Sequence, residues 1–235
     1  MFKIRKAGER GFANAAGVKS RLSFSWGKYH DSKWSGWGCL VAINEVRMSP
    51  GASAPKLWVK GAEIFTVVLS GSLFVSGAAG SKLCRAGELH RISAVSGLEC
   101  LMSNGSKTEE LWCVQVVVSC LGGPHPPSMS QIRLPDSRRQ GGLMLASSQD
   151  GDDESMRIFS DAKIHSGLFD GAQSARMVID ADKKTLVAVL RGSVDANGHR
   201  LDQGDAALID GEGELKLDEG KRAEVLVFEL GLLPR

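Results

Sequence analysis

Short apolar runs separated by polar turns recur along the whole chain. Runs rich in Val, Leu, Ile and Phe occupy residues 39–47, 63–69, 88–93, 110–119, 174–180, 185–190 and 223–230. Gly, Ser, Asn and Asp separate these runs, as expected for short strands joined by tight turns. No long segment shows the 3.6-residue period of an amphipathic helix. The pattern therefore predicts an all-β protein.

A weak internal repeat connects the two halves of the chain. Val-Val-Leu-Ser-Gly-Ser at 67–72 is echoed by Val-Ala-Val-Leu-Arg-Gly-Ser at 187–193. The turn pair Gly87-Glu88 is echoed by Gly204-Asp205 in the same order. Each half therefore reads as strand, Gly turn, strand, Gly-acid turn and further strands, which is typical of a small double-sheet barrel built twice.

The repeat divides the chain into two domains. We expect an N-terminal barrel over residues 1–130 and a smaller C-terminal barrel over 131–235. The predicted linker covers residues 121–140, because its prolines disfavour strand and helix alike. Within this linker, Arg138 and Arg139 are interpreted as a solvated basic pair.

Composition and charge narrow the classes of function. The 235 residues are 43% hydrophobic, which suits a packed globular protein, and the formal net charge is +2. So small a charge gives no argument for a nucleic acid or an acidic surface as a partner. No run of about eighteen apolar residues predicts a membrane span, and no apolar segment of a signal peptide follows the basic N-terminus. The sequence therefore predicts a cytoplasmic protein with neither a nucleic-acid nor a membrane partner.

The cysteines agree with a reducing compartment. They are odd in number, lie in apolar runs and lack Cys-x-x-Cys spacing, so we expect reduced, buried thiols. The five residues are Cys39, Cys84, Cys100, Cys113 and Cys120.

Several motifs, in a consistent order along nearly the whole chain, resemble the pirin-like bicupins. This bacterial group is often labelled quercetin 2,3-dioxygenase-like. The motifs that carry the resemblance lie at 5–14, 23–31, 63–71, 86–104 and 225–230. The resemblance implies a bicupin fold, with two double-stranded β-helix (jelly-roll) barrels in one chain. It also implies one metal, usually iron, held in the N-terminal barrel by three histidines and a glutamate.

The chain departs from that ligand pattern at all four positions. The resemblance places the histidines at Leu57, Val59 and Cys100, and the glutamate at Met102. Iron(II) in such a site needs imidazole and carboxylate donors, and Leu and Val have no lone pair to offer. Cys and Met commonly pack as adaptable hydrophobic side chains, although two sulfurs on one strand face could bind copper(I) or zinc. We therefore expect no metal cofactor and an apolar pocket at these four residues.

Two polar side chains are candidates for the same pocket. Glu63 stands where many cupins place a glutamate ligand, and Gln115 shares strand parity with Leu111 and Cys113. Each also has a plainer interpretation, as a structural carboxylate and a satisfied core amide. A lone histidine such as His90 is more often structural, and no Ser/His/Asp grouping can be assembled, so the sequence identifies no catalytic residue.

The aromatic residues of the first forty positions have two interpretations. Trp26, Tyr29, Trp34 and Trp37 could form the rim of a pocket that stacks a planar ligand. They could equally pack the N-terminal segment over the first barrel, which is the interpretation that we favour.

Three hypotheses about function remain open. The first is a metal-free, non-catalytic bicupin that binds a small apolar or aromatic molecule, or a protein partner, as a regulatory module. The second is a quercetin 2,3-dioxygenase-like oxidoreductase with an atypical metal site made by Cys100, Met102 and Glu63, and it rests on the resemblance alone. The third is an interaction protein whose barrel is filled by its own side chains. We expect a monomer, since two barrels can bury their interface within one chain.

Overall fold

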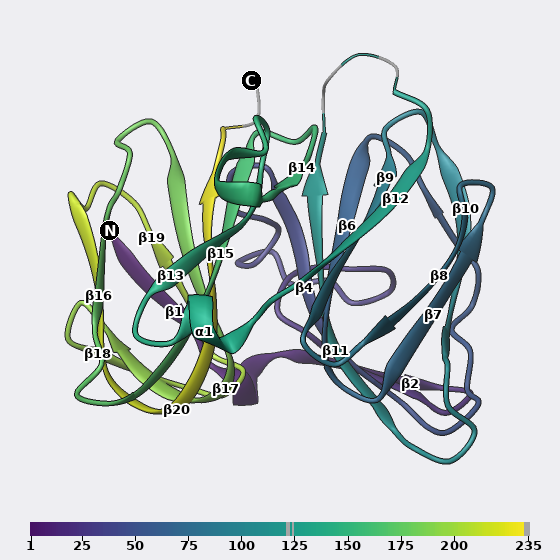
Figure 1. Ribbon diagram of the computed structural model, residues 1–235, viewed down its shortest axis with the longest axis horizontal. Helices are drawn as coiled ribbons and strands as arrows, with labels where there is room; N and C mark the ends of the chain where they lie inside the picture. Colours follow the sequence, from purple (N-terminus) through teal and green to yellow (C-terminus); the bar gives the residue numbers. More distant parts are fainter. Residues whose placement is uncertain (121–122, 124, 233–235) are drawn as a thin grey trace. The chain divides into compact units, whose positions relative to one another are not determined.

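The chain folds into two compact units built almost entirely of β-strands. The computed structural model describes residues 1–120, 123 and 125–232. One unit, called here the N-terminal unit, holds Gly11–Gly36 and Leu40–Arg133. The other, the C-terminal unit, holds Met1–Arg10, Trp37–Cys39 and Leu134–Arg235. The strand-rich architecture in Figure 1 confirms the predicted all-β bicupin fold.

The N-terminal unit is a barrel of two antiparallel sheets. The seven-stranded sheet has the order β12-β9-β6-β11-β4-β3-β2, and the four-stranded sheet has the order β5-β10-β7-β8. The bounds of the first sheet are β2 Gly11–Ala15, β3 Val18–Leu22, β4 Leu40–Met48, β6 Ala62–Ser70, β9 Glu88–Ala94, β11 Leu111–Ser119 and β12 Ser128–Arg133. The bounds of the second are β5 Leu57–Val59, β7 Ser72–Gly77, β8 Gly80–Arg85 and β10 Leu98–Asn104. One apolar cluster fills the interior between these sheets.

The C-terminal unit is built around one sheet of nine strands. Its main path has the order β1-β19-β17-β20-β15-β13-β14, with β16 paired to β20 and β18 paired to β17. The strands are β1 Phe2–Arg5, β13 Leu143–Ser148, β14 Met156–Arg157, β15 Ala162–Gly171, β16 Ala175–Val178, β17 Lys184–Ala196, β18 His199–Asp202, β19 Ala206–Ile209 and β20 Glu214–Leu230. The helices of the chain are α1 Asp136–Arg139 and the 3-10 turns η1 Ala7–Glu9 and η2 Asp152–Glu154.

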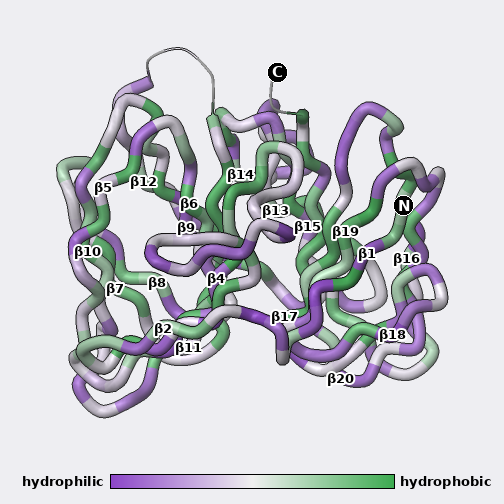
Figure 2. The backbone as a smooth tube through the Cα atoms, turned by 180° about the vertical axis from the view of Figure 1, so that it is seen from behind, coloured by the Kyte–Doolittle hydropathy of each residue, from purple (hydrophilic) through white to green (hydrophobic). Residues whose placement is uncertain are grey.

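Alternate residues of the central strands face the interior cluster of the N-terminal unit. Along β6, Ala62, Ile64 and Val68 enter the apolar cluster of the N-terminal unit, and along β11 Leu111 and Cys113 do the same. Hydrophobic residues concentrate on the strands and hydrophilic ones on the turns (Figure 2). Within the described part of the chain, no helix combines the length and the apolar character that a membrane crossing requires.

The unit boundaries differ in two ways from the division at residue 130. The predicted linker contains the strand β12, which pairs with β9, and the helix α1; residues 121, 122 and 124 of the linker lie outside the described residues. The first ten residues group with the C-terminal unit, where β1 pairs with β19 from Phe2↔Ile209 to Arg5↔Ala206. Sequence patterns could not assign this strand, because its partner lies about two hundred positions away.

The internal repeat reappears as equivalent turns. The backbone N–H of Gly87 donates to Val68 (3.0 Å), and that of Gly204 donates to Val189 (2.8 Å). The acidic residue after each glycine accepts the backbone N–H three positions earlier, at 2.8 Å for Glu88 and 3.1 Å for Asp205. The two halves therefore use the same turn chemistry to end a strand.

A second equivalent pair of glycines yields a testable prediction. Gly71 and Gly192 have φ values of +74° and +63°, and a Cβ at Gly192 would clash with the carbonyl oxygen of Lys221. We expect Gly192→Ala to lower the free energy of unfolding by about 2–3 kcal/mol, because both φ and the neighbouring backbone oppose a side chain. The control is Gly198→Ala, at φ +77° with nothing within 4 Å, which should cost only about 1 kcal/mol. Urea unfolding of both variants measures the difference, and equal losses would contradict the steric argument.

Candidate functional site

Four residues singled out by the family resemblance converge inside the N-terminal barrel. β5 and β10 run antiparallel, with Leu57 opposite Cys100 and Val59 opposite Leu98. Met102 follows Cys100 on the same face of β10, because successive side chains on a strand alternate. Leu57 is half-buried, whereas Val59, Cys100 and Met102 are buried in one apolar cluster. The structure therefore brings the four side chains together.

A cavity of about 240 Å³ opens beside these residues. Its lining combines apolar, amide and hydroxyl side chains with one lysine: Ser20, Leu22, Trp26, Asn44, Val46, Met48, Ala54, Pro55, Lys56, Leu57, Met102 and Gln115. Leu57, Met102 and Gln115 are thus at the cavity wall, while Val59 and Cys100 lie in the adjoining cluster. Pro55 and Lys56 are exposed, so they mark the end of the cavity that meets solvent.

Gln115 is the polar candidate that reaches the cavity. Its Nε2 lies 2.7 Å from the Sδ of Met102, to which it donates a hydrogen bond. This contact occupies the thioether, and it leaves the amide oxygen of Gln115 as a polar group at the cavity wall. Asn44, directly opposite Gln115 across β4 and β11, also lines the cavity and was not singled out from the sequence.

Glu63 does not line the cavity. It alternates along β6 with Ala62 and Ile64, which enter the apolar cluster, so its side chain belongs to the opposite face of the strand. There its Oε1 lies 3.3 Å from Nη1 of Arg91, and the two side chains are 0% and 7% exposed. In the structure Glu63 is thus a buried carboxylate paired with Arg91.

The cysteine thiols of the interior are held in their protonated form. Burial, with a smaller contribution from Glu99, raises the pKa of Cys100 above its ordinary value. Burial also raises the pKa of Cys84 and of Cys113 to about 12. The thiolate is the form that binds metal ions, so this environment disfavours sulfur ligation. All five cysteines of the chain are buried, and no disulfide joins them.

The donor set beside the cavity does not fit an iron site of the family type. Leucine and valine carry no donor atom, and the thiol and the thioether are soft. Across residues 1–120, 123 and 125–232, no group of three or more His, Cys, Asp or Glu side chains could hold a metal ion.

His90 is a buried histidine of the same interior. It is 0% exposed on β9, and within the described part of the chain neither ring nitrogen has a hydrogen-bond partner. Burial lowers its pKa from 6.5 to about 4, with further contributions from Lys82 and Arg91. The imidazole is therefore neutral at physiological pH.

This environment predicts a pH dependence of stability. Below pH 6.5 the unfolded chain binds a proton at His90 that the folded chain does not bind until about pH 4. The free energy of unfolding should thus fall by about 3 kcal/mol as the pH drops from 6.5 to 4. Urea unfolding of the wild type and of His90→Gln at pH 7.5, 6, 5 and 4.5 isolates this contribution from that of the carboxylates. If the free energies of unfolding of the two proteins fell in parallel with pH, His90 would not contribute to the pH dependence.

The aromatic residues of the first forty positions separate in the structure. Trp26 lines the cavity, whereas Trp34 is buried within the N-terminal unit. Trp37 groups with the C-terminal unit, and the Tyr29 hydroxyl donates to Asp31 at 3.2 Å. Only one of the four side chains is thus at the cavity, and the others pack or pair elsewhere.

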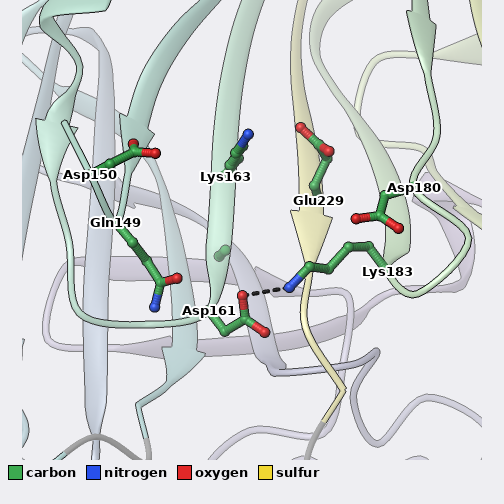
Figure 3. A pocket seen from close by; sticks show the side chains of 8 residues that line it. Gln149, Asp150, Asp161, Lys163, Asp180, Lys183 and Glu229 are labelled. Atoms are coloured by element: carbon green, nitrogen blue, oxygen red, sulfur yellow. Dashed lines mark hydrogen bonds and ion pairs between the residues drawn. The ribbon is translucent and has the colours of Figure 1, made fainter. Parts of the chain in front are cut away.

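The C-terminal unit carries a second, more polar hollow (Figure 3). Its volume is about 170 Å³, and it is lined by Gln149, Asp150, Asp161, Ala162, Lys163, Asp180, Lys183 and Glu229. Lys183 pairs with Asp161 at 2.5 Å, and Glu229 pairs with His165 at 2.8 Å. Three of its charged side chains, Asp161, Lys183 and Glu229, are thus paired within the unit.

Fold and site together define a class of protein. The chain is a bicupin whose N-terminal barrel contains a small cavity with mainly apolar walls and an amide-bearing side.

Comparison with known proteins shows which bicupins this chain is similar to. The family model of the quercetinase C-terminal cupin domain matches residues 145–230. The quercetin 2,3-dioxygenase of Escherichia coli K12 is 29% identical over 98% of this chain and 99% of its own length. A pirin-like protein of Caulobacter vibrioides is 25% identical over 93% of this chain and 95% of its own. The crystal structure of the bacterial pirin YhhW from E. coli in complex with nickel(II) has a TM-score of 0.93 and 27% identity, and covers 99% of this chain and 100% of that one. Over nearly its whole length the chain is thus similar to proteins named quercetin 2,3-dioxygenase or pirin.

Proposed function

We propose that this protein is a metal-free, non-catalytic member of the group and binds a small, largely apolar or aromatic molecule in its N-terminal barrel. The observation that carries the proposal is the cavity wall itself. Leu57 and Met102, at two of the positions where the resemblance places metal ligands, line an open cavity. Cys100 and Val59 extend the same apolar cluster.

Cavity size and lining support a small ligand. An apolar cavity of about 150 Å³ is known to hold benzene, and pockets for drug-sized ligands are typically about 300–1,000 Å³. A cavity of about 240 Å³ therefore suits a molecule of one or two rings. Trp26, half-buried and in the lining, offers an aromatic surface for such a ring.

Elemental analysis tests the metal part of the proposal. Protein purified without a tag is expected to carry less than about 0.1 equivalent of iron, nickel, copper or zinc per chain, because the lining described above includes no imidazole, carboxylate or thiolate. Near-stoichiometric metal would instead favour the quercetin 2,3-dioxygenase-like alternative with an atypical site.

Calorimetry tests the binding part. Indane, a two-ring hydrocarbon, is expected to bind the wild type, and Leu57→Trp should weaken this binding at least about tenfold by filling the cavity. The matched control is Leu101→Trp, on the same sheet but alternating with the cavity-facing residues of β10. If both variants lose indane binding equally, or if neither indane nor a polar two-ring analogue binds the wild type, the cavity is not the site.

A further inference from the structure

A row of five polar side chains crosses the inner face of the seven-stranded sheet. The strand registers place Asn44 opposite Gln115, Gln115 opposite Thr66, Thr66 opposite His90 and His90 opposite Gln131. The five residues come from five neighbouring strands, β4, β11, β6, β9 and β12. We call this set the polar row.

The rows on either side are apolar. One neighbouring row consists of Ala42, Val117, Ile64, Ile92 and Met129 in the same register, and all five belong to or pack on the interior cluster. The row on the other side includes Val46, Cys113 and Val68. A single polar line between hydrophobic lines is unexpected for a barrel that only fills itself.

The polar row contains buried atoms that the protein leaves without a partner. Asn44, Thr66 and His90 are 3%, 0% and 0% exposed. The Oδ1 of Asn44, the Oγ1 of Thr66 and both ring nitrogens of His90 have no hydrogen-bond partner among the residues that the structure describes. Buried polar groups of this kind are normally satisfied, so the row is suited to a molecule that brings its own donors and acceptors.

The row and the cavity meet at Asn44 and Gln115, which belong to both. The remaining walls are mainly apolar. Lys56, the one charged residue of the lining, is exposed at the solvent end and pairs with Glu99 at 2.8 Å. The neutral imidazole of His90 adds no charge either. The inner end of the cavity thus offers hydrogen bonds without offering an ion pair.

We propose that the polar row recognises a neutral one- or two-ring molecule through an edge that carries both a donor and an acceptor, as a cyclic amide does. This inference rests on the proposed function, because it assigns a chemical class to the ligand of the same cavity. The amides of Asn44 and Gln115 make the first contacts, since a side-chain amide can donate and accept at once. Thr66 and His90 continue the hydrogen-bonding line deeper in the barrel.

A matched pair of probes tests the inference. Indane and 2-oxindole share one skeleton, but only 2-oxindole carries a cyclic amide. By calorimetry on the full chain, 2-oxindole is expected to bind at least about tenfold more tightly than indane. Asn44→Leu and Gln115→Leu should each remove this preference, while their affinity for indane stays within about threefold of the wild type. Ser20→Ala, in the lining but outside the polar row, should keep the preference.

The outcomes separate the inference from the proposed function. If indane binds and 2-oxindole binds no more tightly, the polar row is only hydrated and the inference fails, while the cavity proposal stands. If neither probe binds, the proposed function fails and the inference with it. If the leucine variants fail to fold, Asn44→Asp and Gln115→Glu replace them, and they should reduce the 2-oxindole preference by removing the amide donor. An unchanged preference in both would overturn the assignment.

Discussion

Replacing Leu57, Val59 and Cys100 with histidine and Met102 with glutamate is expected to create a nickel(II) site with a dissociation constant of about 10 µM or tighter. Leu57 lies directly opposite Cys100, and Val59 and Met102 follow them on the same inner faces of β5 and β10. Three imidazoles and a carboxylate at these places supply the donor types that divalent metals such as nickel prefer. The expected change is from no measurable affinity to at least micromolar affinity.

Calorimetry with nickel(II) at pH 7.5 measures this gain. Binding should weaken below about pH 6, because the imidazoles must be deprotonated to act as ligands. The control replaces the same residues with Asn, Asn, Asn and Gln. These amides also add four polar side chains to the core, but they are weak ligands for metal ions. A quadruple histidine–glutamate variant that folds but takes up neither nickel(II) nor iron(II) would show that these residues do not occupy the positions of the family's metal ligands.

The second large effect concerns the buried ion pair of the N-terminal unit. We expect Arg91→Met to lower the free energy of unfolding by about 3–5 kcal/mol, because it removes the cationic partner of a fully buried carboxylate. Glu63 lies 3.3 Å from Arg91, whose Nη2 also donates to Ser128 at 2.8 Å. The double variant Glu63→Gln/Arg91→Met should recover part of this loss, since it removes both charges.

An exposed arginine supplies the matched control for this substitution. Arg133 on β12 is 79% exposed and lies 3.9 Å from Glu88, so Arg133→Met should change stability by no more than about 0.5 kcal/mol. Chemical unfolding of the four proteins at pH 7.5 gives the comparison. A loss below about 1 kcal/mol for Arg91→Met, or no recovery in the double variant, would contradict the assignment of a charge pair.

Local patterns in the sequence accounted for the strands and for the turns between them. Apolar runs located β4, β6, β9, β11 and β17, because a half-buried or buried strand leaves a short hydrophobic signature. The turns at Gly71 and Gly192 could also be predicted from the sequence, since both need a positive φ that few other residues adopt. The architecture of two barrels followed from the repetition of these local signals.

Long-range pairing and side-chain partners could not be predicted in the same way. The sequence predicts a solvated Arg139, but this residue is 4% exposed and its guanidinium binds Glu224, eighty-five positions away, at 2.7 Å. The polar row was also missed, because its five members lie on five strands and become neighbours only through their register. Gln115 was found from strand parity, which is a local property, and Asn44 could have been found by the same alternation along β4.

The long-range pairing of the first strand affects the order in which the C-terminal unit can fold. Phe2–Arg5 completes the sheet of the C-terminal unit by pairing with Ala206–Ile209, and Lys6 and the backbone of Ala7 hold Asp205. This strand therefore cannot dock until its partner, about two hundred positions later in the chain, has been synthesised. Separating the chain after residue 130 would leave β1 without its partner strand and β19 with an uncovered edge, so the two units should be expressed together.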